Sequence, residues 1–123
     1  MKRSSWIAIG FLLLLLNAGW LWAFPEPNLF YILNVLLHVG LGWVMFAALF
    51  LWGSDTLKAF RRQSRTTFAV LAVCGLLGAV LSFIGAIRPH YWIVVAHGFL
   101  GFLGAALLWF YVSRQHPRFT KPL

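Results

Sequence analysis

The sequence predicts an all-α integral membrane protein, folded as an up-down-up-down four-helix bundle. The chain has 123 residues, of which 62% are hydrophobic and 10% are charged, whereas soluble domains carry about 25% charged residues. Four apolar runs are also long enough to cross a hydrocarbon core of ~30 Å, which takes about 20 helical residues. Only short connections and tails remain, so we expect a single four-span domain over residues 1–123.

The expected spans follow one another closely along the chain. The first, residues 5–24, begins after two basic residues as a signal peptide does. Its apolar part is too long for one, however, and no small-residue cleavage site precedes Pro25, so we interpret it as a retained helix. The other three spans are residues 29–52, 68–87 and 91–112. Aromatic residues gather near the ends of the spans, as is typical of the membrane interface.

The basic residues are distributed unevenly between the two sides of the membrane that the expected spans define. Arg88 is the one basic residue expected on the side that also holds Glu26. The other nine are Lys2, Arg3, Lys58, Arg61, Arg62, Arg65, Arg114, Arg118 and Lys121. This asymmetry is the positive-inside pattern, and it predicts a multi-pass protein of the bacterial inner membrane with both termini cytoplasmic. It also accounts for the net charge of +8 through contact with membrane lipid, so no nucleic-acid partner is expected.

Two histidines lie inside apolar spans, where an ionisable side chain is costly and usually functional. His38 is nine residues past Leu29 and His97 is six past Tyr91, so at ~1.5 Å per residue both lie about 9–14 Å from the outer end. Short loops make successive helices antiparallel neighbours, which leaves the second and fourth spans parallel and diagonally opposed. Two imidazoles at one depth on such helices can bind a haem iron from both sides. The alternative is an interhelical hydrogen bond without a cofactor.

Glycines surround the predicted iron position. Gly42 and Gly101 each lie one turn beyond a histidine on the same helical stripe, by i+4 spacing. Gly19 in the first span and Gly78 in the third lie at comparable depth. These positions would give clearance to a bulky macrocycle, although glycines also serve plain helix packing in membranes.

Three polar residues are candidates to support a bound haem. A ligating imidazole usually donates its second N–H to an acceptor, and Asn34 lies one turn before His38. Arg88 and His90 fall at the outer edge, where haem propionates would emerge; a lipid phosphate is the other candidate partner of Arg88. His90 also precedes His97 by seven residues on the same stripe, which makes it the alternative ligand if the fourth span begins later.

With these features the chain resembles the membrane-bound b-type cytochromes. In the cytochrome b subunits of quinol-oxidising complexes, a four-helix bundle holds haem between histidines of its second and fourth helices, with glycines on the first and third. The resemblance implies that His38 and His97 are the axial ligands of one haem b, and that a quinone is a second candidate cofactor. Those cytochromes carry a second histidine pair about four turns away. Here the corresponding residues 50–52 and 108–111 contain no histidine, so a second haem is not expected.

The sequence contains no recognisable set of catalytic residues in addition to the histidines. The two acids, Glu26 and Asp55, fall in or near loops on opposite sides, and the single Cys74 is interpreted as a small core residue. We therefore expect an electron-transfer subunit of a larger redox complex rather than a catalyst on its own. It would exchange electrons at the outer face with quinol or with an extracytoplasmic c-type cytochrome. The alternative is a cofactor-free structural subunit of a membrane complex.

Overall fold

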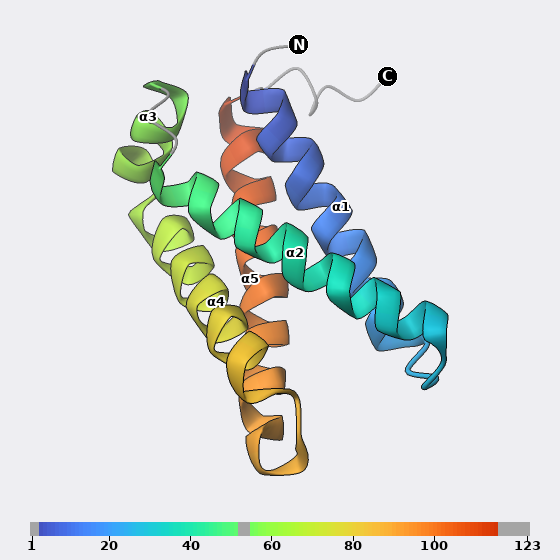
Figure 1. The fold of residues 1–123 in the computed structure, drawn as a ribbon. Helices are drawn as coiled ribbons and strands as arrows, with labels where there is room; N and C mark the ends of the chain where they lie inside the picture. Colours follow the sequence, from blue (N-terminus) through green and yellow to red (C-terminus); the bar gives the residue numbers. More distant parts are fainter. Residues whose placement is uncertain (1–2, 52–54, 116–123) are drawn as a thin grey trace.

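The computed structural model describes residues 3–51 and 55–115, and these residues are helical almost throughout. The elements in order are α1 (Arg3–Ala23), α2 (Leu29–Leu51), α3 (Asp55–Gln63), α4 (Arg65–Ile84), the 3-10 helix η1 (Arg88–His90) and α5 (Tyr91–Gln115). The described ranges contain no strand, which confirms the all-α class. The long helices are α1, α2, α4 and α5, and Figure 1 shows α3 near the end where α1 begins and α5 finishes.

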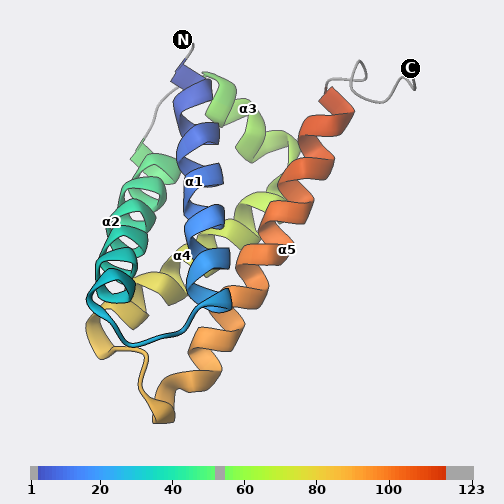
Figure 2. The ribbon, with the colours of Figure 1, turned by 90° about the vertical axis from the view of Figure 1, so that its right-hand side faces the viewer.

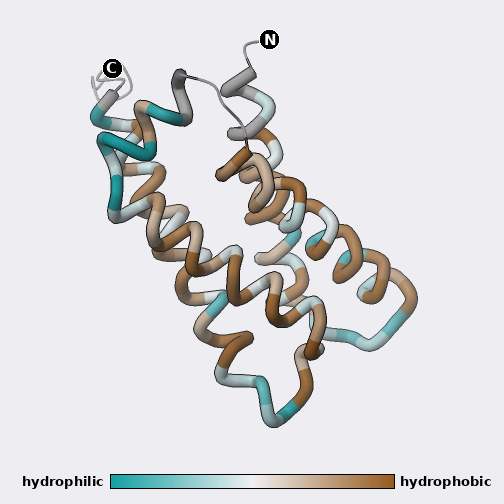
Figure 3. The backbone as a smooth tube through the Cα atoms, turned by 60° about the vertical axis from the view of Figure 1, so that its left-hand side comes forward, coloured by the Kyte–Doolittle hydropathy of each residue, from teal (hydrophilic) through white to brown (hydrophobic). Residues whose placement is uncertain are grey.

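Three of the long helices are apolar enough to cross a membrane. They cover Leu29–Leu51, Arg65–Ile84 and Arg88–Arg114, whereas α1 contributes a shorter apolar stretch, Ile9–Ala23. Large apolar side chains are exposed along these helices; Leu51 and Phe83, for example, are 83% and 82% exposed. Figure 3 shows the same pattern, with hydrophobic residues along the long helices and hydrophilic ones at their ends. Such a surface is unfavourable in water and suits contact with lipid.

The helices that follow one another in the chain also pack together. The most extensive packing joins α4 to α5, and further contacts join α1 to α2 and α2 to α4. Figure 2 shows α1 in front of α4, with α2 on one side and α5 on the other. Glycines permit close approach at these contacts, because a Cβ added at Gly104 would lie 2.6 Å from Leu71 Cδ2 and one added at Gly10 would lie 2.8 Å from Met45 Sδ.

The third expected span ends three residues earlier than predicted. α4 stops at Ile84, and Gly85 takes a positive φ of 76° while its N–H donates to the Leu81 carbonyl at 2.9 Å. A glycine reaches this backbone conformation without the clash that a Cβ would cause. Residues 85–87 therefore belong to the turn that leads into η1. At the other end of the second span, Trp52 lies outside the described residues.

A nine-residue helix, α3, replaces part of the connection expected between the second and third spans. Phe60 is its buried anchor, with its ring centroid 5.2 Å from that of Tyr111 on α5. The Tyr111 hydroxyl donates to Gln63 Oε1 at 3.0 Å. Ser64 then separates α3 from α4, and its hydroxyl donates to Thr67 Oγ1 at 2.6 Å. These contacts hold the basic segment against the ends of α4 and α5.

Candidate functional site

The two histidines singled out from the sequence meet in the structure. The imidazole rings of His38 on α2 and His97 on α5 have centroids 6.1 Å apart, with their planes at 88°. Both side chains are half-buried. Their depths agree because His38 lies nine residues after Leu29, and His97 lies nine residues after Arg88, where the two apolar segments begin.

The ring separation fits a shared metal ion. A metal–imidazole bond of ~2.0–2.1 Å on each side, plus roughly 1.1 Å from each nitrogen to its ring centre, places the centroids roughly 6 Å apart. Direct edge-to-face contact between two rings covers a similar range, about 4.5–7 Å. The centroid distance is therefore compatible with both a shared metal ion and direct packing of the two rings. The hydrogen bonds of each ring distinguish these two interpretations.

The His97 ring is oriented by the backbone of α4. Its Nδ1 lies 2.9 Å from the Cys74 carbonyl oxygen. A carbonyl can only accept, so Nδ1 donates and Nε2 keeps its lone pair. The Cys74 thiol in turn donates to the His97 carbonyl at 3.4 Å. An imidazole that donates one N–H to a carbonyl and presents the other nitrogen has the arrangement common among metal-ligating histidines.

Gly78 supports the same ring from the next turn of α4. A Cβ added at Gly78 would lie 2.8 Å from His97 Cε1 and 3.3 Å from its Nδ1. Gly78 was predicted to give clearance to a macrocycle, and the structure shows that it gives clearance to the imidazole itself. The sequence contained no signal for the Cys74 contact, because any residue can supply a carbonyl.

The other three candidate glycines divide into two groups. At Gly19 and Gly42 an added Cβ would meet no atom within 4 Å, so both face open space. At Gly101 it would lie 3.7 Å from Cys74 Sγ, an ordinary contact between α5 and α4. Open space is what a bulky ligand requires beside α1 and α2, whereas Gly101 serves helix packing.

Within the part of the chain that the structure describes, the Nδ1 atom of His38 lacks the kind of hydrogen bond that Nδ1 of His97 makes. It is buried and has no hydrogen-bond partner among the described residues. The expected contact with Asn34 is not formed, because that amide donates to the Phe30 carbonyl at 2.8 Å and accepts from Asn17 Nδ2 at 3.0 Å. Asn17 was not predicted as a site residue, although a lone amide inside an apolar span was a signal for it in the sequence. Its own Oδ1 is buried without a donor.

The end of the molecule that was predicted to face outward is formed by η1 and the start of α5. Arg88 is exposed there, and His90 Nδ1 is buried without a partner in the described part of the chain. The ring that faces His38 is that of His97, so the structure favours His97 over His90 as the second member of the pair. No group of three or more potential metal ligands occurs in residues 3–51 and 55–115, so any metal here would depend on two protein ligands.

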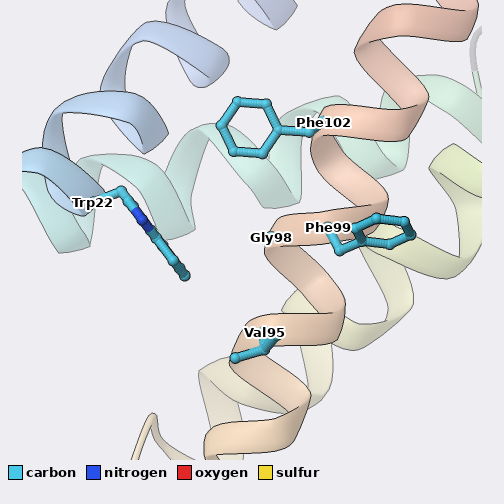
Figure 4. A pocket seen from close by; sticks show the side chains of 5 residues that line it. All are labelled: Trp22, Val95, Gly98, Phe99 and Phe102. Carbon is cyan, nitrogen blue, oxygen red and sulfur yellow. The ribbon is translucent and has the colours of Figure 1, made fainter.

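An apolar pocket of about 230 Å³ opens between α1 and α5. Figure 4 shows its lining, with Trp22 on α1 and four residues of α5. Those four are Val95, Gly98, Phe99 and Phe102. Its volume is below the ~300–1,000 Å³ usual for small-molecule sites, and neither histidine lines it.

Comparison with known proteins assigns no family to this geometry. No protein-family model matches the chain, and no curated protein and no solved structure matches it. A helical membrane fold is compatible with many functions. The histidine pair and its surroundings are therefore the features of the chain that bear on its function.

Proposed function

We propose that this chain is a membrane electron-transfer subunit that binds one haem b between His38 and His97, within a larger redox complex. The observation that carries the proposal is the 6.1 Å separation of the two imidazole centroids from opposite helices. A single turn of displacement in either helix would move one ring by about 5.4 Å. The matched depth is thus a demanding geometric condition, and the pair fulfils it.

Several residues of the chain would bind or accommodate the cofactor. When bound, a haem supplies one-electron exchange between the ferric and ferrous states of its iron. His97 Nε2 would hold the iron, because Nδ1 donates to the Cys74 carbonyl, a contact that also raises the basicity of the imidazole. His38 would be the second ligand. The open space beside Gly19 and Gly42 would accommodate the edges of the macrocycle.

The unsatisfied His38 ring favours a ligand over an empty core. A buried polar group without a partner costs about 1–3 kcal/mol. In a cofactor-free chain His38 would carry this cost deep in an apolar segment, and the two rings would make only an edge-to-face contact. Coordination of a metal through His38 Nδ1 would give that atom a strong partner, whereas coordination through Nε2 would leave Nδ1 in need of another one.

We further propose that the four long helices cross the membrane in alternating directions, with both termini in the cytoplasm of a bacterial cell. The supporting observation is the distribution of charge. Arg3 begins α1, and Arg114 lies in the last turn of α5. Figure 1 shows that these two helix ends and the basic helix α3 lie at one end of the molecule, whereas η1, which contains Arg88, lies at the other. Cytoplasmic loops carry such an excess of basic residues.

The proposed redox partners follow from this sidedness. The histidines lie nearer the end that carries residues 25–28 and η1, so electrons would be exchanged there. Quinol within the outer leaflet, or a c-type cytochrome docked outside it, would be the partner. Arg88 is exposed at this surface and would contact a haem propionate or an acidic partner group.

A visible spectrum of the purified full chain tests the proposal. The protein would be expressed with a haem supply, and a reduced-minus-oxidised spectrum and iron content measured in mild detergent. We expect an α-band and about one iron per chain, the stoichiometry of a single bis-histidine site. His38→Ala and His97→Ala should each remove most of the haem, and His90→Ala is the matched control that should retain it. A wild-type chain without an α-band would overturn the proposal.

The second candidate is a cofactor-free structural subunit. The 88° ring geometry favours it, since edge-to-face packing is a stable arrangement for two rings in a core. This candidate predicts a chain that purifies without haem and in which His97→Ala acts on stability alone. The iron measurement above separates the two functions.

A further inference from the structure

The helix α3 carries basic side chains and a buried aromatic anchor. Phe60 is 8% exposed, whereas Arg62 and Arg65 are exposed and Arg61 is half-buried. Asp55 is the only acid that the sequence places near this end. The surface defined by Arg61, Arg62 and Arg65 is therefore strongly cationic.

The position of this cationic surface is fixed relative to the apolar helices. Phe60 and Gln63 both contact Tyr111, which lies near the end of the apolar part of α5. Arg65 is the first residue of α4, whose apolar segment follows at once. Figure 2 shows α3 crossing the end of the helices rather than projecting away from them. The helix α3 and the first residue of α4 are thus held at the level where the apolar segments stop.

We propose that α3 is an interfacial helix whose two arginines, together with Arg65 at the start of α4, bind the phosphates of anionic phospholipid headgroups. The partner follows from charge complementarity and depth, because a guanidinium at the edge of the hydrocarbon core meets headgroup phosphates first. Guanidinium groups bind phosphate in a bidentate manner, which gives more than a diffuse charge effect. Arg114 reinforces this end, with its guanidinium 4.1 Å from the Phe110 ring centroid. The inference is independent of whether the chain binds haem.

Lipid selectivity of the full chain in detergent tests this assignment. Phosphatidylglycerol and phosphatidylcholine with identical acyl chains would be titrated separately, and bound lipid counted by native mass spectrometry. A basic residue near an anionic lipid surface strengthens binding by about fivefold. We therefore expect at least a ~10-fold preference for phosphatidylglycerol from three arginines acting together. No preference in the wild-type chain would overturn the proposal.

Variants locate the lipid site and separate charge from folding. R61Q/R62Q/R65Q should lose most of the preference, while R61K/R62K/R65K, which keeps the charge, should retain much of it. Arg88→Gln is the location control, and it should cost less of the preference than R62Q or R65Q does; a larger loss in Arg88→Gln would place the site elsewhere and refute the proposal. If the glutamine variant fails to fold, salt gives the second test. The wild-type preference should fall several-fold between about 50 and 500 mM salt as charges are screened, and a salt-independent preference would contradict arginine–phosphate binding.

Discussion

His97 is held on two sides by α4, and this determines how its ring is presented. The Cys74 carbonyl accepts its Nδ1–H at 2.9 Å, and Gly78 leaves room for the ring edge. The sequence predicted the histidine pair because ionisable residues are rare inside apolar spans. It did not predict the carbonyl, since hydrogen bonds to the backbone have no residue signature. It predicted a contact between Asn34 and His38, yet the Asn34 amide bonds to Asn17 on α1 instead.

The contact between Gly78 and His97 gives a prediction at single-residue resolution. Gly78→Ala would place a methyl carbon 2.8 Å from His97 Cε1, so the imidazole must shift by several tenths of an ångström or more. Because metal ligation requires accurate geometry, we expect haem content to fall several-fold. Gly98→Ala is the matched control on α5, where an added Cβ would lie 3.7 Å from Trp22 Cζ3, and it should keep its haem. Full haem content with an unchanged spectrum in Gly78→Ala would contradict this role.

At the level of the elements, periodicity and length predicted the long helices well. The predicted second and fourth spans begin where α2 and α5 begin, at Leu29 and Tyr91. The helix α3 was not predicted, because a nine-residue segment with three cations resembles a solvated connection. The three-residue spacing of Leu57 and Phe60 in the sequence was the available signal for an amphipathic helical turn. The end of α4 was placed too late because Ile87 continues the apolar run after Gly85, whose positive φ ends the helix.

The conformation of Gly85 predicts a cost for any side chain there. Its φ of 76° and ψ of 158° fall in a region that is essentially restricted to glycine. Gly85→Ala should lower the free energy of unfolding by about 1–3 kcal/mol, measured by denaturant titration in detergent. Gly40→Ala is the control, since Gly40 is helical, exposed and without neighbours within 4 Å. Alanine there should raise stability by up to about 1 kcal/mol. Equal effects of the two substitutions would show that backbone strain is not the cause.

At the scale of the whole molecule, charge placement predicts orientation in the membrane. Within the described ranges, α3 and the basic ends of α1 and α5 share one end of the molecule (Figure 1). A reporter that is active only outside the cytoplasm, fused after Leu123, should therefore stay silent, and a cytoplasmic reporter at the same position should be active. The converse pair, inserted between residues 26 and 27, should give the opposite result. Activity of the outer reporter after Leu123 would reverse the assignment.

The lengths of helix on either side of the histidine pair determine where electrons could enter and leave a haem bound there. From the histidines to the ends of the apolar segments near α3 there are 13 residues on α2 and 17 on α5, or about 20–26 Å of helix. On the outer side nine residues of α2 precede His38, or about 14 Å. No second histidine lies along the longer path in the described helices, so exchange should occur at the outer surface.

Arg88 is the basic residue at that outer surface, and it tests one-sided electron exchange. Arg88→Glu would replace an exposed cation beside the proposed propionate edge with an anion, which repels an acidic partner and lowers the haem potential by favouring the ferric state. We expect slower reduction by quinol or a cytochrome partner in stopped-flow measurements, a lower midpoint potential, or both, with haem content kept. Arg88→Lys should behave as the wild type does. An Arg88→Glu chain with unaltered rate and potential, or a second haem near the α3 end, would refute exchange at the outer face.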